Sequence, residues 1–300
     1  MASSIEANYL SELYRNWTAR MAADPGMSIA DLRSVFDDWH QPTLEPEGVT
    51  YKNDAVGGVE GIWVFPEAAD HRKVLVFTHG GGFAVGSSSS HRKLAGHVAK
   101  ALGAVAFVLD FRRSPEHPFP AQLEDVTAVY RDLLAQGFDP RNLTTIGDSA
   151  GGNLAISSVL KLRALALPLP GAVIVFSPWL DMEHKGATLV TNDATDALIT
   201  KPLLETMSSM YLDHVSAPSN PLANPLYADF QGFPRLYINA GAVESLLDDA
   251  KRLHMRASTA GVDSTLSVVD GMQHVFPFLA GRAREADEEI RRIAAWFALV

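Results

Sequence analysis

The nonapeptide LTTIGDSAG, residues 143–151, decides the fold of this chain. Its first half is a short run typical of a buried parallel strand, and its second half is a G-x-S-x-G turn. In such a turn a serine lies on a sharp bend between a strand and a helix, with its hydroxyl exposed. Small residues flank Ser149 because the bend leaves no room for side chains, and glycine tolerates the required backbone angles. The stretch therefore predicts a strand, a candidate nucleophile and a helix in direct succession.

A second glycine-rich segment, His79-Gly80-Gly81-Gly82, follows a run at 73–79 that predicts another strand. Its backbone N–H groups can point at a developing oxyanion. The expected donors are the N–H groups of Gly81, Gly82 and Ala150. Ala150 also opens a helix, where the helix dipole favours negative charge. The two motifs together, in this order, indicate acyl transfer.

Short β-rich runs alternate with helical patterns from Val59 onward. Such alternation predicts an α/β fold with a mostly parallel central sheet and helices on both faces. The candidate strands are 59–65, 73–79, 104–110, 143–147, 171–177, 235–240 and 264–269, and the helical patterns are 88–102, 121–136, 150–166, 246–260 and 282–298.

Two stretches depart from this alternation and predict a helical cap. Apolar spacing is helical throughout residues 1–45, and the stretch 181–230 holds one strong helix signal opened by Pro202. Together they would cover the carboxyl ends of the strands, where ligands bind in open α/β sheets. The expected division is residues 1–45 and 181–230 as cap, with 46–180 and 231–300 as the two parts of the catalytic core.

A serine hydroxyl needs a base to take its proton, and a carboxylate best holds that base. Four histidines follow Ser149 in the chain. His184 and His214 lie in the irregular stretch, and His254 lies in a helical pattern on the expected surface. His274 follows the strand at 264–269, where a loop at the carboxyl edge of the sheet would place it. We therefore predict His274 as the base.

The carboxylate should follow a strand that lies between the serine and the histidine in the chain. The strand at 235–240 is followed by Gly-Ala-Val-Glu-Ser-Leu-Leu-Asp-Asp, residues 241–249. Glu244 is the first acidic residue after this strand and is the predicted acid. Asp248, one helical turn later, is the alternative.

Composition narrows the class of protein. The chain has 300 residues, 47% of them hydrophobic, a net charge of −10 and no cysteine. This balance argues against a nucleic-acid partner or an anionic membrane surface. The absence of cysteine excludes disulfides and thiolate metal sites. Neither a signal peptide nor an apolar run of about 18 residues is found, so we expect a cytoplasmic protein without a membrane anchor.

The motifs resemble those of the bacterial hormone-sensitive lipase family of esterases, which carry HGGG and GDSAG. The segment DFRRSPEHPFPA at 110–121 is similar to the family's D-Y-R-L-A-P-E-H-P-F-P-A, and SPWLD at 177–181 matches its S-P-W-L-D. The resemblance implies an α/β-hydrolase fold and a serine carboxylesterase that needs no metal or organic cofactor. Carried over by position, it implies Ser149 as nucleophile, His274 as base and Gly81, Gly82 and Ala150 as the oxyanion hole. It also suggests a homodimer through an edge strand near 264–270.

One departure from the family concerns the acid. The family usually has D-P-L-x-D-E there, whereas this chain has ESLLDD at residues 244–249. Glutamate is one methylene longer than aspartate, so its loop must lie further back for the carboxylate to reach His274.

The expected substrate is a short-chain acyl ester, because a covered pocket favours small acyl groups. A lactone, opened by the same chemistry, is the alternative. The residues that we expect to line the pocket are large and apolar. They are Leu10, Trp17, Trp39, Phe83, Leu203, Met207, Met210 and Tyr211.

Two more distant functions fit part of the pattern. The spacing Gly80-x-Gly82-x-x-x-Gly86, with Asp110 after the next strand, resembles an NADP-dependent oxidoreductase. An oxidoreductase would leave the GDSAG turn without a function. A non-catalytic ligand-binding homologue, as in plant hormone receptors, would have lost the catalytic histidine, which this chain keeps as His274.

Overall fold

The computed structural model describes residues 4–215 and 220–299. Within them, eight strands form one sheet in the order β1-β2-β4-β3-β5-β6-β7-β8. The strands are β1 (Val49–Val56), β2 (Val59–Pro66), β3 (Asp70–Thr78), β4 (Ala104–Leu109), β5 (Leu143–Asp148), β6 (Ala172–Phe176), β7 (Arg235–Gly241) and β8 (Ser264–Val269). The strands from β4 to β8 in this order run parallel, whereas β2 is antiparallel to both β1 and β4. The predicted sheet is confirmed.

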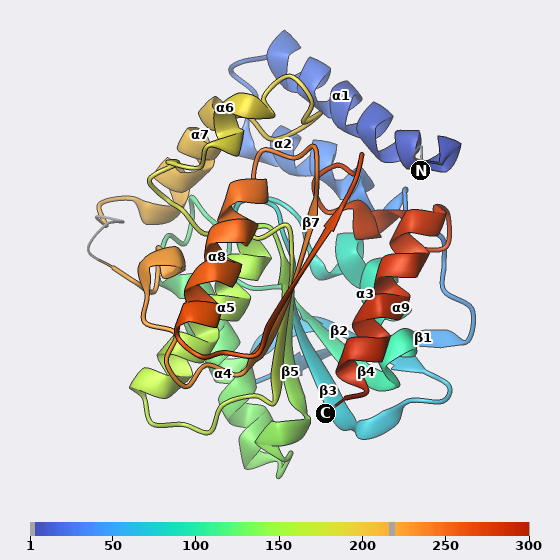
Figure 1. The fold of residues 1–300 in the computed structure, drawn as a ribbon, viewed down its shortest axis with the longest axis vertical. Helices are drawn as coiled ribbons and strands as arrows, with labels where there is room; N and C mark the ends of the chain where they lie inside the picture. The colour runs from blue at the N-terminus through green and yellow to red at the C-terminus, as the bar shows by residue number, and fades with distance from the viewer. Residues whose placement is uncertain (1–3, 216–219, 300) are drawn as a thin grey trace.

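Helices cover both faces of the sheet, so its inner strands are buried on two sides. Helices α3 (Ser88–Leu102) and α9 (Arg284–Phe297) lie on one face, and α4 (Ala121–Ala135), α5 (Ala150–Ala164) and α8 (Leu247–Thr259) lie on the other (Figure 1). All residues of β4, β5 and β6 are buried. Apolar side chains pointing both ways from these strands fill the core, as expected for a parallel sheet.

One strand was missed by the sequence analysis. β1 pairs with β2 across the turn Gly57-Gly58, where both glycines have a positive φ. The centre of β1 reads Tyr-Lys-Asn-Asp, and most of the strand is exposed or half-buried. An edge strand of this kind carries little of the apolar signal by which strands are predicted.

The remaining α-helices, α1, α2, α6 and α7, lie above the carboxyl ends of the strands (Figure 1). We call residues 8–40 and 188–212 the cap. It contains α1 (Asn8–Ala23), α2 (Ile29–Phe36), η2 (Asp37–His40), α6 (Thr188–Thr191) and α7 (Lys201–Leu212). Further along the stretch predicted as cap, η5 (Pro225–Tyr227) instead packs beside the sheet against α5 and α8.

Aromatic packing and one arginine hold the N-terminal part of the cap to the core. Trp39 of the cap stacks on Phe278 and packs against the edge of His91, with ring centroids 5.2 Å and 5.3 Å away. The guanidinium of Arg33 donates to the backbone oxygens of Ala84 and Ser114 and to the carboxylate of Glu116. The cap is thus fastened next to the predicted oxyanion segment. Among the described residues, no helix is both long and apolar enough to cross a bilayer.

Candidate active site

Ser149 lies at the bend between β5 and α5 with a φ of 52°, which is rare for a residue other than glycine. The bend is possible because the residues two positions before and after Ser149 are glycines. A Cβ on Gly147 would collide with the carbonyl oxygen of Gly151, and one on Gly151 would collide with that of Thr78. The prediction that the hydroxyl of Ser149 is exposed is wrong. Ser149 is only 6% exposed, because the cap covers it.

The glycine segment after β3 lies beside this bend. Gly81 and Gly82 have φ values of 109° and 59°, and among the described residues no hydrogen-bond acceptor is found for their N–H groups or for that of Ala150. Buried Asp148 joins the two motifs, because its Oδ1 accepts a 3.1 Å hydrogen bond from the N–H of Gly80. The three N–H groups are therefore free to bind an anion near Ser149.

His274 and Glu244 come from the loops after β8 and β7, and both are fully buried. Nδ1 of His274 lies 3.7 Å from Oε1 of Glu244, the separation of an ion pair rather than of a hydrogen bond. Burial lowers the pKa of His274, but the carboxylates of Glu244, Asp196 and Asp148 outweigh it, so the pKa is raised above its usual 6.5. The site thus holds an imidazole with increased basicity.

Ser177 links the loops that carry these two residues. Its hydroxyl donates a 2.6 Å hydrogen bond to Oε2 of Glu244 and accepts one of 2.9 Å from the N–H of Val275. The same Oε2 also accepts from the N–H of Gly241 at 2.9 Å. The SPWLD motif by itself assigns no role to Ser177. Its role depends on the positions of the two loops, which come from parts of the chain distant in sequence.

The other candidate acid and the other three histidines after Ser149 lie outside the cavity of Ser149 and His274. Asp248, the alternative acid, is paired with Arg252 at 3.3 Å on α8. His254, expected on the surface, is half-buried and contacts Ser264, because β8 packs next to α8. His184 stacks on Trp179, and His214 is almost fully exposed.

Ser149 and His274 line one cavity beneath the cap. Its volume is about 30 Å³, far below the roughly 300–1,000 Å³ of ordinary ligand pockets. The lining is mostly apolar and comprises Phe36, Trp39, Gly81, Gly82, Val85, Ser149, Trp179, Leu198, Ile199, Leu203, Leu204, Met207 and His274. Even a small ester is larger than this space.

Of the expected pocket residues, Trp39, Leu203 and Met207 line this cavity. Trp17 and Leu10 do not: both are buried in the hydrophobic core, where Trp17 packs on Phe36 and Trp39. Phe83 and Tyr211 do not, because their rings stack on each other with centroids 3.6 Å apart. Met210, three residues after Met207 on α7, is half-buried and is not among the lining residues.

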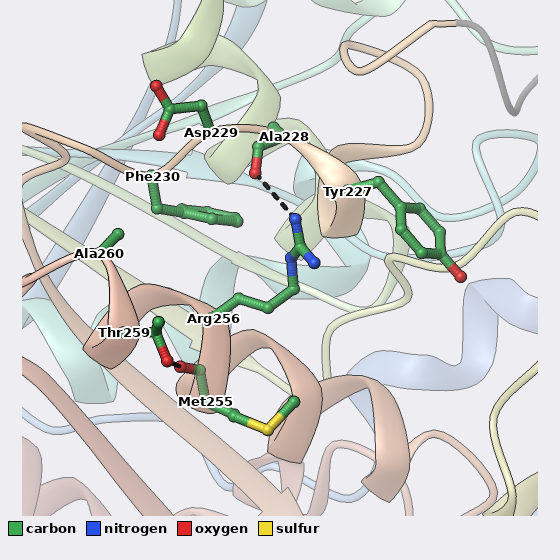
Figure 2. A pocket seen from close by; sticks show the side chains of 8 residues that line it. All are labelled: Tyr227, Ala228, Asp229, Phe230, Met255, Arg256, Thr259 and Ala260. Atoms are coloured by element: carbon green, nitrogen blue, oxygen red, sulfur yellow. Dashed lines mark hydrogen bonds between the residues drawn. The ribbon is translucent and has the colours of Figure 1, made fainter.

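A larger hollow of about 580 Å³ lies away from Ser149, between α8 and the segment 227–230 (Figure 2). Arg256 reaches across it and donates a 3.3 Å hydrogen bond to the carbonyl oxygen of Ala228. None of its lining residues belongs to the Ser149 cavity.

Neither a metal site nor a dinucleotide site is found among the described residues. The described ranges contain no group of three or more His, Asp or Glu side chains arranged to hold a metal ion. Asp110, which a dinucleotide site would use, accepts hydrogen bonds from the N–H and hydroxyl of Ser88 at the start of α3.

Comparison with known proteins identifies the class. Residues 75–278 match the family model of the alpha/beta hydrolase fold. An acetyl-hydrolase of Streptomyces hygroscopicus is 41% identical over 221 residues, covering 74% of this chain and 73% of that protein. An esterase of Acinetobacter venetianus is 29% identical, covering 95% and 94% of the two chains.

A solved structure extends the likeness to the whole chain. The crystal structure of an esterase from the bacterial hormone-sensitive lipase family is 38% identical, with a TM-score of 0.93 over 99% of this chain and 98% of that one. The chain belongs to the α/β-hydrolase fold family and, within it, to the bacterial hormone-sensitive lipase esterases. It is a carboxylic ester hydrolase.

Proposed function

We propose that this chain is a serine esterase that hydrolyses esters of short acyl groups through an acyl-enzyme. Ser149 is the nucleophile, His274 the base and Glu244 the acid that orients it. One observation carries the proposal: Ser149 and His274 line one cavity together with Gly81 and Gly82, whose N–H groups have no acceptor among the described residues.

The reaction begins with the transfer of the Ser149 proton to Nε2 of His274, which has no hydrogen-bond partner among the described residues. The serine oxygen bonds to the ester carbonyl carbon, and the carbonyl oxygen becomes an oxyanion. The N–H groups of Gly81, Gly82 and Ala150 bind that oxyanion, each such donor typically contributing about 3 kcal/mol to the transition state.

Collapse of this intermediate breaks the bond to the alcohol oxygen, which takes the proton from His274. A water molecule then attacks the acyl-enzyme while His274 accepts its proton. The same imidazole returns a proton to Ser149 as the carboxylic acid leaves. Throughout, the carboxylate of Glu244 stabilises the imidazolium that forms.

Three observations support a short acyl group. The cavity next to Ser149 holds only about 30 Å³, and Met207 packs directly on Gly82. The Streptomyces relative is named an acetyl-hydrolase. Acetyl and butyryl esters are therefore the proposed substrates, and lactones, which the same residues would open, belong in the same assay series.

The test is hydrolysis of p-nitrophenyl acetate by Ser149→Ala. Ser158→Ala is the matched control, because Ser158 is a buried serine of α5, the helix that follows Ser149, and its hydroxyl donates to the carbonyl oxygen of Ala155 in its own helix. We expect kcat/KM to fall by about 10⁴-fold or more in Ser149→Ala and to stay near the wild-type value in the control. Wild-type rates in Ser149→Ala would refute the proposal.

A further inference from the structure

A short segment of the cap is bound closely to the two loops that carry Glu244 and His274. This segment, residues 192–199, connects α6 to the start of α7. The side-chain amide of Asn192 donates to the carbonyl oxygen of Glu244 at 2.9 Å. The amide of Gln273, next to His274, accepts from the N–H of Ala197 at 2.8 Å and donates to the carbonyl of Thr195 at 2.9 Å. The segment therefore touches both loops.

Asp196 lies at the centre of these contacts and is only 8% exposed. Its Oδ1 accepts from the N–H groups of Leu198 and Ile199 at 2.9 Å and 2.8 Å. Its Oδ2 accepts from the N–H of Ser245 at 2.6 Å. Leu198 and Ile199 form part of the cavity wall, and Ser245 directly follows Glu244. One buried carboxylate thus joins the cavity wall to the loop of the acid.

The three contacts require a carboxylate. Both of its oxygens accept hydrogen bonds, whereas a side-chain amide would turn a donor toward one of these N–H groups. Among the described residues, no lysine or arginine forms an ion pair with Asp196. A buried charge without a cationic partner is costly, and proteins keep such groups most often at functional sites.

We propose that Asp196 is a positioning residue of the esterase reaction, which fixes the Glu244 loop against the cavity wall and supplies negative charge that favours protonated His274. This inference rests on the proposed function.

The proposed effect of Asp196 on the charge of His274 depends on the titratable groups that face His274. They are Glu244 after β7, Asp196 in the cap segment, Asp148 at the end of β5 and Tyr14 from α1, whose hydroxyl donates to the carbonyl of His274. The three carboxylates raise the pKa of His274, while burial keeps the pKa of Tyr14 well above 10, so that it stays neutral. Removing the charge of Asp196 should therefore lower the pKa of His274.

The experiment compares Asp196→Asn with Asp193→Asn, an exposed aspartate of the same segment, by kcat and KM for p-nitrophenyl acetate between pH 5 and 9. In Asp196→Asn we expect kcat to fall about 10- to 100-fold, with a smaller change in KM, because a slight displacement of the acid is costly. The acid limb of the profile should move to lower pH by about half a unit or more. Asp193→Asn should match the wild type.

Asp196→Glu separates the effect of the negative charge from the effect of the hydrogen-bond geometry. It also replaces Asp196→Asn as the test variant if that variant does not fold. It keeps the charge, so its acid limb should stay at the wild-type pH even where kcat is reduced. Any one of three results would overturn the inference. Asp196→Asn could keep the wild-type kcat, its acid limb could stay at the wild-type pH, or the limb could move equally in Asp196→Glu. If Ser149→Ala also stays active, the proposed function fails. If Ser149→Ala is inactive, only the role of Asp196 fails.

Discussion

Oε1 of Glu244 faces Nδ1 of His274 across 3.7 Å, while its other oxygen is held by the hydroxyl of Ser177 and the N–H of Gly241. The longer side chain of glutamate is thus anchored at one oxygen and leaves the other directed at the imidazole. Asp248 makes no such contact and is bound by Arg252. This arrangement favours Glu244 as the acid of the proposed triad.

The first prediction concerns this choice. Glu244→Gln should lower kcat by about 10²- to 10⁴-fold, because the imidazolium formed during reaction loses its carboxylate. Asp248→Asn should stay within about twofold of the wild type, because its half-buried side chain pairs with Arg252 and lies outside the cavity of Ser149 and His274. Steady-state kinetics on p-nitrophenyl acetate compares the two. A larger loss of kcat in Asp248→Asn would transfer the role to that residue.

The second prediction concerns pH. His274 acts as a base only when neutral, so activity is lost as pH falls through its pKa. Because the neighbouring carboxylates raise that pKa above 6.5 despite burial, the acid limb of kcat/KM should be centred above pH 6.5. In Glu244→Gln the limb should move to lower pH. A wild-type limb centred well below 6.5 would show that the carboxylates do not act on His274 in this way.

The third prediction concerns Ser177, whose hydroxyl bonds to both loops. Ser177→Ala leaves the buried N–H of Val275 without an acceptor, which should lower the free energy of unfolding by about 1–3 kcal/mol. It should also reduce kcat, because Glu244 loses one of the two hydrogen bonds on Oε2. Urea unfolding and kinetics measure the two effects. If both kcat and the free energy of unfolding stay unchanged, the hydrogen bonds of Ser177 contribute neither to catalysis nor to stability.

The fourth prediction concerns acyl length. Met207 packs on Gly82 inside the cavity, whereas Met210, one turn further along α7, lies outside it. Met207→Ala should enlarge the acyl site and raise the ratio of kcat/KM for hexanoate over acetate esters, and Met210→Ala should leave this ratio unchanged. Equal ratios in the two variants would mean that the acyl chain lies elsewhere.

The fold could be predicted from the sequence because each buried strand and each covering helix carries its own apolar pattern. Ser28 and Ser87 begin α2 and α3 as N-caps, each accepting a hydrogen bond from the N–H three residues later. β1 could not be found in this way, because it is a polar edge strand. Its one local signal was the Gly57-Gly58 turn followed by the apolar run of β2.

The lining of the site was harder to predict, because it depends on which cap side chain lies in front of another. Trp17 and Phe36 carry the same helical signal, yet only Phe36 reaches the cavity. Leu198 and Ile199 lie in a stretch without periodicity, so nothing local marks them as pocket residues. Trp179 was visible within SPWLD, but its place beside Ser149 follows only from the sheet order.

The most direct test of the central claim is to treat the active enzyme with an organophosphate and to map the modified peptide by mass spectrometry. We predict complete loss of esterase activity with a single adduct, on Ser149. Loss of activity with the adduct on another residue, or full activity with Ser149 modified, would contradict the proposed mechanism.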